Sequence, residues 1–167
     1  MTDTVDSETR SRIMRAVLQK NTKPELLLRR ALHKLGLRFR VNVARLPGTP
    51  DIVLPKYNTV IFVHGCYWHR HGCDKSTTPK SNANFWERKF SSNRQRDTKN
   101  VKELRQLGWR VMTVWECEMV GKRSRSSLLV AKCVRAWLQT KQTTGELPSQ
   151  EEVEKALNVT SDILVPK

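Results

Sequence analysis

The sequence of 167 residues lacks any apolar run that approaches the roughly 20 residues needed to cross a bilayer. Near its start it also lacks the apolar core of a secretory signal peptide. We therefore expect a cytoplasmic protein, associated with the nucleoid if the source is bacterial. Internal repeats and low-complexity tracts are missing too, and the length suits one domain that is large enough for a real hydrophobic core.

Acidic residues are scarce: 16 Asp and Glu stand against 31 Lys and Arg, which gives a formal net charge of +15. Five of the acids and two of the lysines lie from Gly145 onward, so residues 1–144 hold 29 basic and 11 acidic side chains. We expect the basic part to bind a polyanion, because neutralised phosphates release counterions. Charge alone leaves a solvated basic surface or a ribosome-type binder as alternatives. The acidic tail at 145–167 is expected to be peripheral.

Cysteines are few, and in a cytoplasmic protein the four of them should be thiols or metal ligands and not disulfides. Two lie in a stretch, residues 59–73, that also holds three of the four histidines. That density is not typical of a core. Cys66, His71 and Cys73 have the spacing of a tetrahedral zinc site, and a closed structural site needs a fourth ligand.

Cys117 is the best candidate for the fourth ligand. It follows an apolar β-like run, residues 110–115, which can lie beside the strand predicted at residues 59–63. Cys133 stands instead at an apolar position of a helical pattern, which indicates packing. A loose cluster of unliganded thiols is the alternative to zinc. Bound zinc would contribute on the order of 10 kcal/mol of folding free energy to this loop.

Two acids stand at positions where a chemical and a structural explanation compete. Asp51 leads a short apolar strand, residues 51–54, directly after Pro50. It is either an edge residue or turn cap, or a carboxylate that binds a hard cation such as Mg²⁺ at a strand end. Glu25 belongs to a capping box that starts at Thr22, and the local pattern favours the capping role.

Aromatic residues beside basic ones are a further candidate functional feature. Residues 85–90 mix aromatic rings with arginine and lysine, and Tyr67 and Trp68 lie in the histidine-rich stretch. Such rings can stack on bases or wedge between them, or they can cover the metal loop. A basic segment, residues 7–20, is either a packed helix or an arm laid along a nucleic-acid groove.

The apolar patterns predict a single α/β domain with a small mixed β-sheet flanked by helices. The first core helix begins at the capping box and ends at Gly36, and the alternating run at 37–43 predicts a half-buried strand. The remaining predicted elements are strands at 51–54, 59–63 and 110–115, helices at 96–107 and 124–141, and a short helix at 149–157.

This order of helix, three strands, helix, strand and helix resembles the restriction-endonuclease-like αβββαβ core of the PD-(D/E)xK nuclease superfamily, with Pro50-Asp51 as its first acidic motif. Where that superfamily has an acid, a spacer and a lysine, this chain has Phe62-Val63-His64. The departure is specific. The motifs LPGTPDIV, VIFVHGCYWHRHGC, FW, RD and LGWRVMTVWEC, with MRAV near the start, resemble the very-short-patch-repair (Vsr) DNA mismatch endonucleases over about residues 5–140.

The resemblance implies a Mg²⁺-dependent hydrolase that nicks one strand of duplex DNA. The nick would fall 5′ to the mismatched thymine of a T:G mismatch, which arises when 5-methylcytosine deaminates. An endonuclease domain would occupy residues 1–144, with residues 1–20 as a basic DNA-binding arm and a zinc-bound loop as a structural support. We expect a monomer, and a repair-protein partner is left open.

The resemblance also implies roles for individual residues. The catalytic set would be Asp51 as the Mg²⁺ ligand, the backbone carbonyl of Val63 assisting it, His69 as general base, His64 at the phosphate or leaving group, Glu25 near the metal waters, and Asp97 orienting a histidine. The family often has threonine in place of Val63, a change that a backbone ligand should tolerate. The structural Zn²⁺ ligands would be Cys66, His71, Cys73 and Cys117, and the DNA-contacting residues would be Met14, Tyr67, Trp68 and Trp86.

The chemistry is coherent on its own terms. Hydrolysis of a phosphodiester needs an activated water, neutralised charge on the phosphoryl oxygens and a stabilised leaving oxygen. A carboxylate with Mg²⁺ meets the last two needs, and a histidine that titrates near neutrality meets the first. Two alternatives are a non-catalytic, zinc-stabilised nucleic-acid-binding module and a restriction-type endonuclease that cuts both strands of matched DNA.

Overall fold

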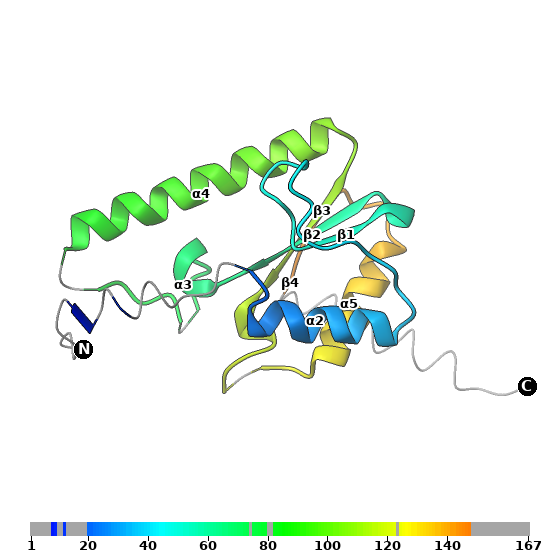
Figure 1. Ribbon diagram of the computed structural model, residues 1–167, viewed down its shortest axis with the longest axis horizontal. Helices are drawn as coiled ribbons and strands as arrows, with labels where there is room; N and C mark the ends of the chain where they lie inside the picture. Colours follow the sequence, from blue (N-terminus) through cyan, green and yellow to red (C-terminus); the bar gives the residue numbers. More distant parts are fainter. Residues whose placement is uncertain are drawn as a thin grey trace, which may run out of the picture.

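The computed structural model describes residues 8–9, 12, 20–73, 75–79, 82–122 and 124–147 of the chain (Figure 1). The predicted basic helix at 7–20 falls almost wholly outside these residues, and Met14 lies outside them. The same holds for the predicted helix at 149–157. Within the part of the chain that is described, no helix has the length and apolar character that a membrane span requires.

A small mixed sheet forms the centre of the fold, as predicted, and it has four strands. Its strands lie in the order β1 (Ile52–Leu54), β2 (Thr59–His64), β3 (Arg110–Trp115) and β4 (Thr144–Leu147). β1 runs antiparallel to β2, whereas β2, β3 and β4 run parallel to one another. The carboxyl ends of β2 and β3 therefore meet at one edge of the sheet, where His64 pairs with Trp115.

Helices cover both faces of the sheet. Figure 1 shows α2 (Lys23–Lys34) and α5 (Ser127–Leu138) on one side and the long α4 (Ala83–Gln106) on the other. Because strand side chains alternate between faces, each helix layer meets a different set of residues. The side covered by α2 and α5 buries Ile52, Leu54, Ile61, Val63, Met112, Val114 and Leu147. The side covered by α4 buries Val53, Val60, Phe62, Val111 and the helix residue Leu104.

α2 begins where the sequence predicts it. The Thr22 backbone N–H donates to Glu25 Oε1 (3.3 Å), which completes the capping box, and Pro24 occupies the first turn. The helix ends at Lys34, and Gly36 then adopts a left-handed φ of +79°. α5 is likewise capped, because the Ser126 hydroxyl accepts from the Leu129 N–H (3.2 Å).

The run at 37–43 is not a strand, contrary to the prediction. It makes one isolated antiparallel bridge, in which Arg40 and Val53 exchange both backbone hydrogen bonds at 2.8 Å. Asn42 has a φ of +47°, a left-handed conformation that breaks the extended run. The alternation of apolar and polar residues therefore reflects a loop that touches the edge of β1.

α4 begins at Ala83, well before the predicted start at residue 96. Its first turns bury only Trp86, Phe90 and Asn93 and expose most of their other side chains, so the apolar stripe is too weak to predict a helix. Their residues are nevertheless good helix formers, among them glutamate, arginine and lysine. Short one-turn helices complete the fold: α3 (Cys66–His69), a 3₁₀ turn at Pro55–Tyr57 and another at Glu116–Glu118.

The tail does not begin at 145 as predicted, because residues 144–147 form β4. Leu147 is fully buried, and the strand pairs with β3 along its length. Gly145 is required at its position, since a Cβ there would overlap the indole of Trp137. A glycine in a four-residue edge strand gives little β signal, which explains why the pattern was missed.

Candidate active site and metal centre

Asp51 is held at the start of β1 by both its neighbours and its side chain. The preceding turn packs tightly on α4: a Cβ on Gly48 would lie 2.6 Å from Asn100 Nδ2, and the φ of Gly48 is +72°. The carboxylate accepts a hydrogen bond from the Val63 N–H, with Asp51 Oδ2 at 2.7 Å. This contact places an acidic side chain beside the backbone at the end of β2, where the prediction put the Mg²⁺ ligands.

Arg29 links the backbone of Asp51 to a second acidic residue, Glu25. Its Nη2 donates to Glu25 Oε2 (2.9 Å) and to the backbone carbonyl of Asp51 (3.0 Å). Glu25 is 3% exposed and Arg29 is 8% exposed, so the pair is shielded from solvent. Glu25 thus caps α2 and also approaches Asp51. Sequence analysis missed Arg29, although its position four residues after Glu25 on one helix was a signal of an ion pair.

The surroundings of Asp51 disfavour the ionised form of its carboxyl group. Burial, opposed by the Val63 N–H and reinforced by the neighbouring Glu25, raises the pKa of Asp51 to about 6. A bound divalent cation would offset that cost, since it favours the ionised carboxylate. The Asp51 carboxylate and the backbone at the end of β2 offer oxygen donors of the kind that Mg²⁺ takes, so these residues fit that ion. Both oxygens of Glu25 already accept hydrogen bonds, which suits a place near the metal waters better than direct ligation.

His69 and Asp97 form a close pair between α3 and α4. The distance from His69 Nδ1 to Asp97 Oδ2 is 2.5 Å. Burial alone would raise the pKa of Asp97, but the hydrogen bond from His69 and the nearby imidazoles hold it below its usual value. With its Nδ1–H donated to a carboxylate, His69 keeps the lone pair of Nε2 free to accept a proton.

His64 lies against the same pair from the end of β2. Its ring stacks on that of His69, with centroids 3.9 Å apart and planes 8° from parallel. Burial, together with the adjacent His69, lowers the pKa of His64 to about 3. Nitrogen lone pairs lie in the ring plane, so stacked rings direct them side by side and not toward one ion. The trio of His64, His69 and Asp97 therefore suits proton handling better than metal ligation.

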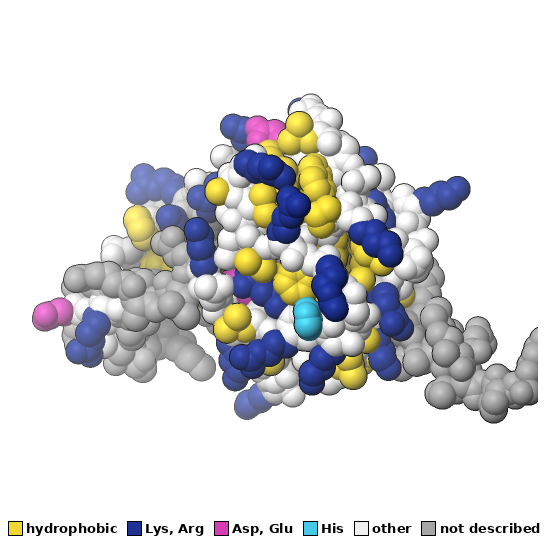
Figure 2. Space-filling model, turned by 45° about the vertical axis from the view of Figure 1, so that its right-hand side comes forward, with side chains coloured by type: hydrophobic (Ala, Val, Ile, Leu, Met, Phe, Trp, Pro, Cys, Tyr) yellow, Lys and Arg dark blue, Asp and Glu magenta, His cyan; other side chains and the backbone are white. Residues whose placement is uncertain are grey.

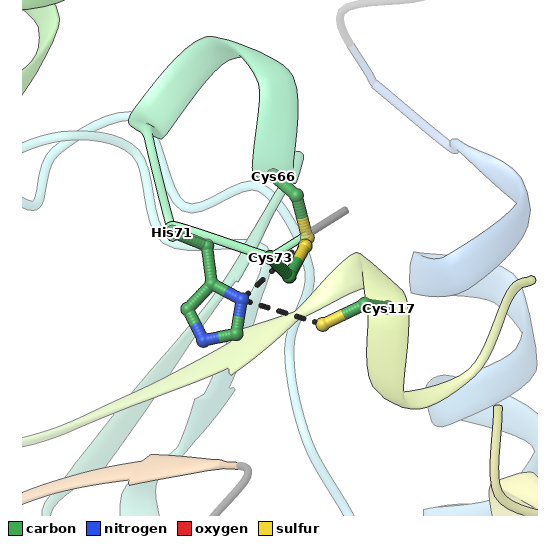
Figure 3. A group of neighbouring side chains, drawn as sticks. All are labelled: Cys66, His71, Cys73 and Cys117. Atoms are coloured by element: carbon green, nitrogen blue, oxygen red, sulfur yellow. Dashed lines mark hydrogen bonds between the residues drawn. The ribbon is translucent and has the colours of Figure 1, made fainter. Parts of the chain in front are cut away.

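A second cluster lies at the same edge of the sheet and contains the four predicted zinc ligands (Figure 3). The ligand atoms of Cys66, His71, Cys73 and Cys117 all lie within 4.8 Å of one another. His71 Nδ1 is 3.4 Å from Cys117 Sγ and 4.0 Å from Cys66 Sγ. Ligands on one tetrahedral zinc, at bond lengths of about 2.0–2.3 Å, are separated by about 3.5–3.8 Å. The cluster can therefore hold a metal ion with little movement.

The thiols of this cluster differ in their acidity. Burial and the neighbouring sulfurs raise the pKa of Cys117, and burial raises that of Cys66. Burial also acts on Cys73, but the backbone N–H of Lys75 and the adjacent thiols lower its pKa. Three thiolates this close repel one another, so full ionisation of the cluster requires a cation. The fourth cysteine, Cys133, is buried in the apolar core, as its helical position predicts.

Aromatic rings connect α3 to the first turns of α4. Tyr67 packs edge-on against Trp68 and Trp86, with centroids 5.0 Å and 5.8 Å apart. The Asn93 side chain also binds α3, donating from Nδ2 to the Trp68 carbonyl (3.0 Å). Trp86 is only 7% exposed, whereas the adjacent Phe85 is 54% exposed. Trp86 could therefore reach a ligand only after a local rearrangement.

Basic side chains are spread widely over the surface. Figure 2 shows lysine and arginine across one face of the molecule, with far fewer acidic groups among them. A basic surface, combined with an acid and paired imidazoles at the end of a mixed sheet, is typical of a nuclease.

Comparison with known proteins agrees with this class. Residues 2–75 match the family model described as DNA mismatch endonuclease Vsr. The chain is 37% identical over 150 residues to the DNA mismatch endonuclease Vsr of Escherichia coli, covering 90% of this chain and 96% of that protein. The chain therefore belongs to the Vsr family and is a DNA endonuclease.

Two further relatives carry names that describe nicking. The type II nicking enzyme V.NmeAIP of Neisseria meningitidis is 47% identical over 133 residues, which is 78% of this chain and 95% of that protein. The type II nicking enzyme V.XorIIP of Xanthomonas oryzae is 48% identical over 119 residues, 71% of this chain and 88% of the relative. An endonuclease family of this kind decides against the alternative of a non-catalytic binding module.

Proposed function

We propose that this endonuclease nicks one strand of duplex DNA, 5′ to the mismatched thymine of a T:G mismatch, in a Mg²⁺-dependent reaction. The reaction would begin very short patch repair of deaminated 5-methylcytosine. The observation that carries the proposal is the convergence of Asp51, the end of β2 and the hydrogen-bonded pair His69–Asp97 at one sheet edge. The names of the relatives, a mismatch endonuclease and two nicking enzymes, support it.

The residues of the site divide the chemical work. Asp51 and the Val63 carbonyl would hold Mg²⁺, with Glu25 near its waters; the ion, when bound, neutralises charge on the phosphate and stabilises the leaving oxygen. His69 Nε2 takes the proton of the attacking water, and Asp97 holds the Nδ1–H and compensates the charge that His69 gains. His64 is uncharged at neutral pH, so it serves the phosphate or leaving group as a hydrogen-bond donor.

The cysteine cluster would hold Zn²⁺ in a structural role. Three thiolates and one imidazole form a closed ligand set that leaves no position for a substrate. Zinc would connect the loop after α3 to the turn after β3, and it would thereby hold α3 and His69 in place. Hydrolysis itself belongs to the neighbouring carboxylate and imidazoles.

Recognition of the mismatch would depend on the aromatic side chains and on how easily the DNA deforms at the mismatched step. Tyr67, Trp68 and Trp86, with Met14 of the N-terminal arm, would enter the stack beside the mismatch. Wedging rings between bases costs a few kcal/mol, and the cost is lower at a poorly paired step. Because Trp86 is buried in the free protein, its insertion would require α3 and the start of α4 to separate. We infer that a monomer suffices for this single-strand cut.

A strand-resolved cleavage assay tests the proposal. Duplexes labelled differently on the two strands, and carrying each mismatch or a matched pair, are incubated with and without Mg²⁺. We expect one nick, 5′ to the thymine, only on the T:G duplex and only when Mg²⁺ is present. Cleavage of both strands of matched DNA would favour a restriction-type endonuclease, and equal cutting of all mismatches would overturn the proposed substrate.

A further inference from the structure

Trp115, the last residue of β3, lies between the two histidine sites. Its indole stacks on the imidazole of His71, with centroids 4.5 Å apart and planes 18° from parallel. The same ring meets His64 edge-on, with centroids 5.5 Å apart and an interplanar angle of 70°. One side chain therefore contacts both a candidate zinc ligand and a candidate catalytic imidazole.

Glu146 of β4 fixes the orientation of this indole. Its carboxylate accepts a hydrogen bond from Trp115 Nε1. The strand register brings the two together, because Glu146 pairs with Thr113, two residues before Trp115 and on the same face of the sheet. Trp115 is 8% exposed, so its N–H depends on this partner, while Glu146 itself is exposed to solvent.

We propose that Trp115, oriented by Glu146, is a positioning residue that holds the His71 and His64 imidazoles in their working orientations. For His71 the inference rests on the proposed zinc site. The ring turns Nδ1 toward the thiols of Cys66 and Cys117, and a flat indole against it restricts rotation of the ring out of that direction. Groups around a metal ligand that fix its orientation typically affect metal affinity by 10–100-fold.

For His64, the indole adds a second ring contact. His69 covers one face of the His64 ring, and Trp115 meets it from another direction. If the indole shifts, His64 can leave the stack, and a small misplacement at a reacting centre can cost a large factor in rate. β4, most of which lies in the tail predicted to be peripheral, thereby influences both sites.

Three single variants and one double variant test this role. Glu146→Ala and Trp115→Phe each remove the hydrogen bond, whereas Glu146→Gln keeps an acceptor and removes only the charge. The first measurement is zinc release from the full chain to a chromogenic chelator, well below the unfolding temperature. The second is nicking of a T:G duplex at saturating Mg²⁺, resolved into kcat and KM.

We expect Glu146→Ala and Trp115→Phe to release zinc about 10-fold faster, the low end of the typical range because Glu146 is exposed. Their kcat should fall about fivefold with little change in KM, and Glu146→Gln should stay within twofold of wild type in both measurements. The double variant Trp115→Phe/Glu146→Ala should match Trp115→Phe in zinc release and in kcat, because both substitutions remove the same hydrogen bond.

Two controls separate positioning from general destabilisation. Thr144→Ala alters an exposed residue of the same strand, and Val130→Ala weakens the core on the opposite face of the sheet. Neither should change zinc release. If the wild type retains zinc but Glu146→Ala and Trp115→Phe release it at the wild-type rate, the inference is overturned. A wild-type chain that holds no zinc would instead refute the proposed metal centre, and with it the role assigned toward His71.

Discussion

His64 and His69 stack face to face, with their ring centroids 3.9 Å apart. Two imidazolium rings cannot occupy such positions together without strong repulsion, so one of them must stay neutral. Asp97 decides which, because it bonds to Nδ1 of His69. The pKa of His64 falls to about 3 through burial and the adjacent ring, which leaves the gain of a proton to His69.

Asp97→Asn should lower the nicking rate by about 10²–10⁴-fold, because a neutral amide neither fixes the tautomer of His69 nor compensates its charge. DNA binding should be unchanged. Single-turnover cleavage and a binding titration on the same T:G duplex measure the two effects. Glu103→Gln, which alters a partly exposed acid on the same helix, is the matched control. A rate for Asp97→Asn within threefold of wild type would show that the pair has no part in proton transfer.

Asp51→Asn should raise the free energy of unfolding of the metal-free protein. Both Asp51→Asn and Asp51→Ala should abolish nicking. The folded-state pKa of Asp51 is raised from 3.8 to about 6, so the folded state disfavours the charged form. Stability from the protonated carboxyl is fully present below pH 3.8 and is lost as the pH rises through about 6. An amide avoids this loss, which amounts to about 3 kcal/mol at pH 8.

Urea unfolding of wild type and Asp51→Asn between pH 4 and pH 8, without Mg²⁺, measures this difference. The two curves should coincide near pH 4 and separate as the pH rises toward 7. A constant difference across this range would mean that the carboxylate is not disfavoured in the fold, and nicking by Asp51→Ala would refute its catalytic role.

Cys117→Ser should lose most of its zinc and several kcal/mol of stability, since structural zinc contributes on the order of 10 kcal/mol. Zinc content by atomic emission and thermal unfolding are the measurements. Cys133→Ala is the matched control, because this buried cysteine belongs to the apolar core and should cost only its packing. A Cys117→Ser protein that is replete with zinc and as stable as wild type would remove Cys117 from the ligand set.

Arg29→Met should destabilise the fold by about 3–5 kcal/mol, the usual cost of removing one partner of a buried ion pair. The change removes the cationic partner of the buried Glu25 carboxylate and the hydrogen bond to the Asp51 carbonyl. Arg30→Met, which removes an exposed arginine from the next position of α2, should be nearly neutral. Denaturant unfolding of both variants decides the matter, and equal stability of the two would contradict the role of Arg29.

The part of the fold that follows from local pattern was predictable. β2 and β3 are continuous runs of β-branched and apolar residues, and both were predicted within one residue of their observed bounds. Their parallel pairing brings Cys117 to the loop after β2, as the position of the cysteine after an apolar run suggested. α2 carries its start signal in its capping box.

The remainder depends on contacts between segments that are distant in sequence. β4 is recognisable only once Gly145 is seen against Trp137, and the contact of Glu146 with Trp115 spans 31 positions. Arg29 reaches Asp51 across 22 positions. From the sequence alone, charged residues such as these are expected on the solvated surface. Only the tertiary structure brings their partners close to them.

The metal cluster joins segments that are far apart along the chain: His71 and Cys117 are separated by 46 positions, and all of α4 lies between them. An ion bound there would close a loop that contains this long helix. The closed loop would lower the conformational entropy of the unfolded chain. Chelation should therefore expose α4 as a unit to proteolysis, before the helices on the opposite face of the sheet are cut.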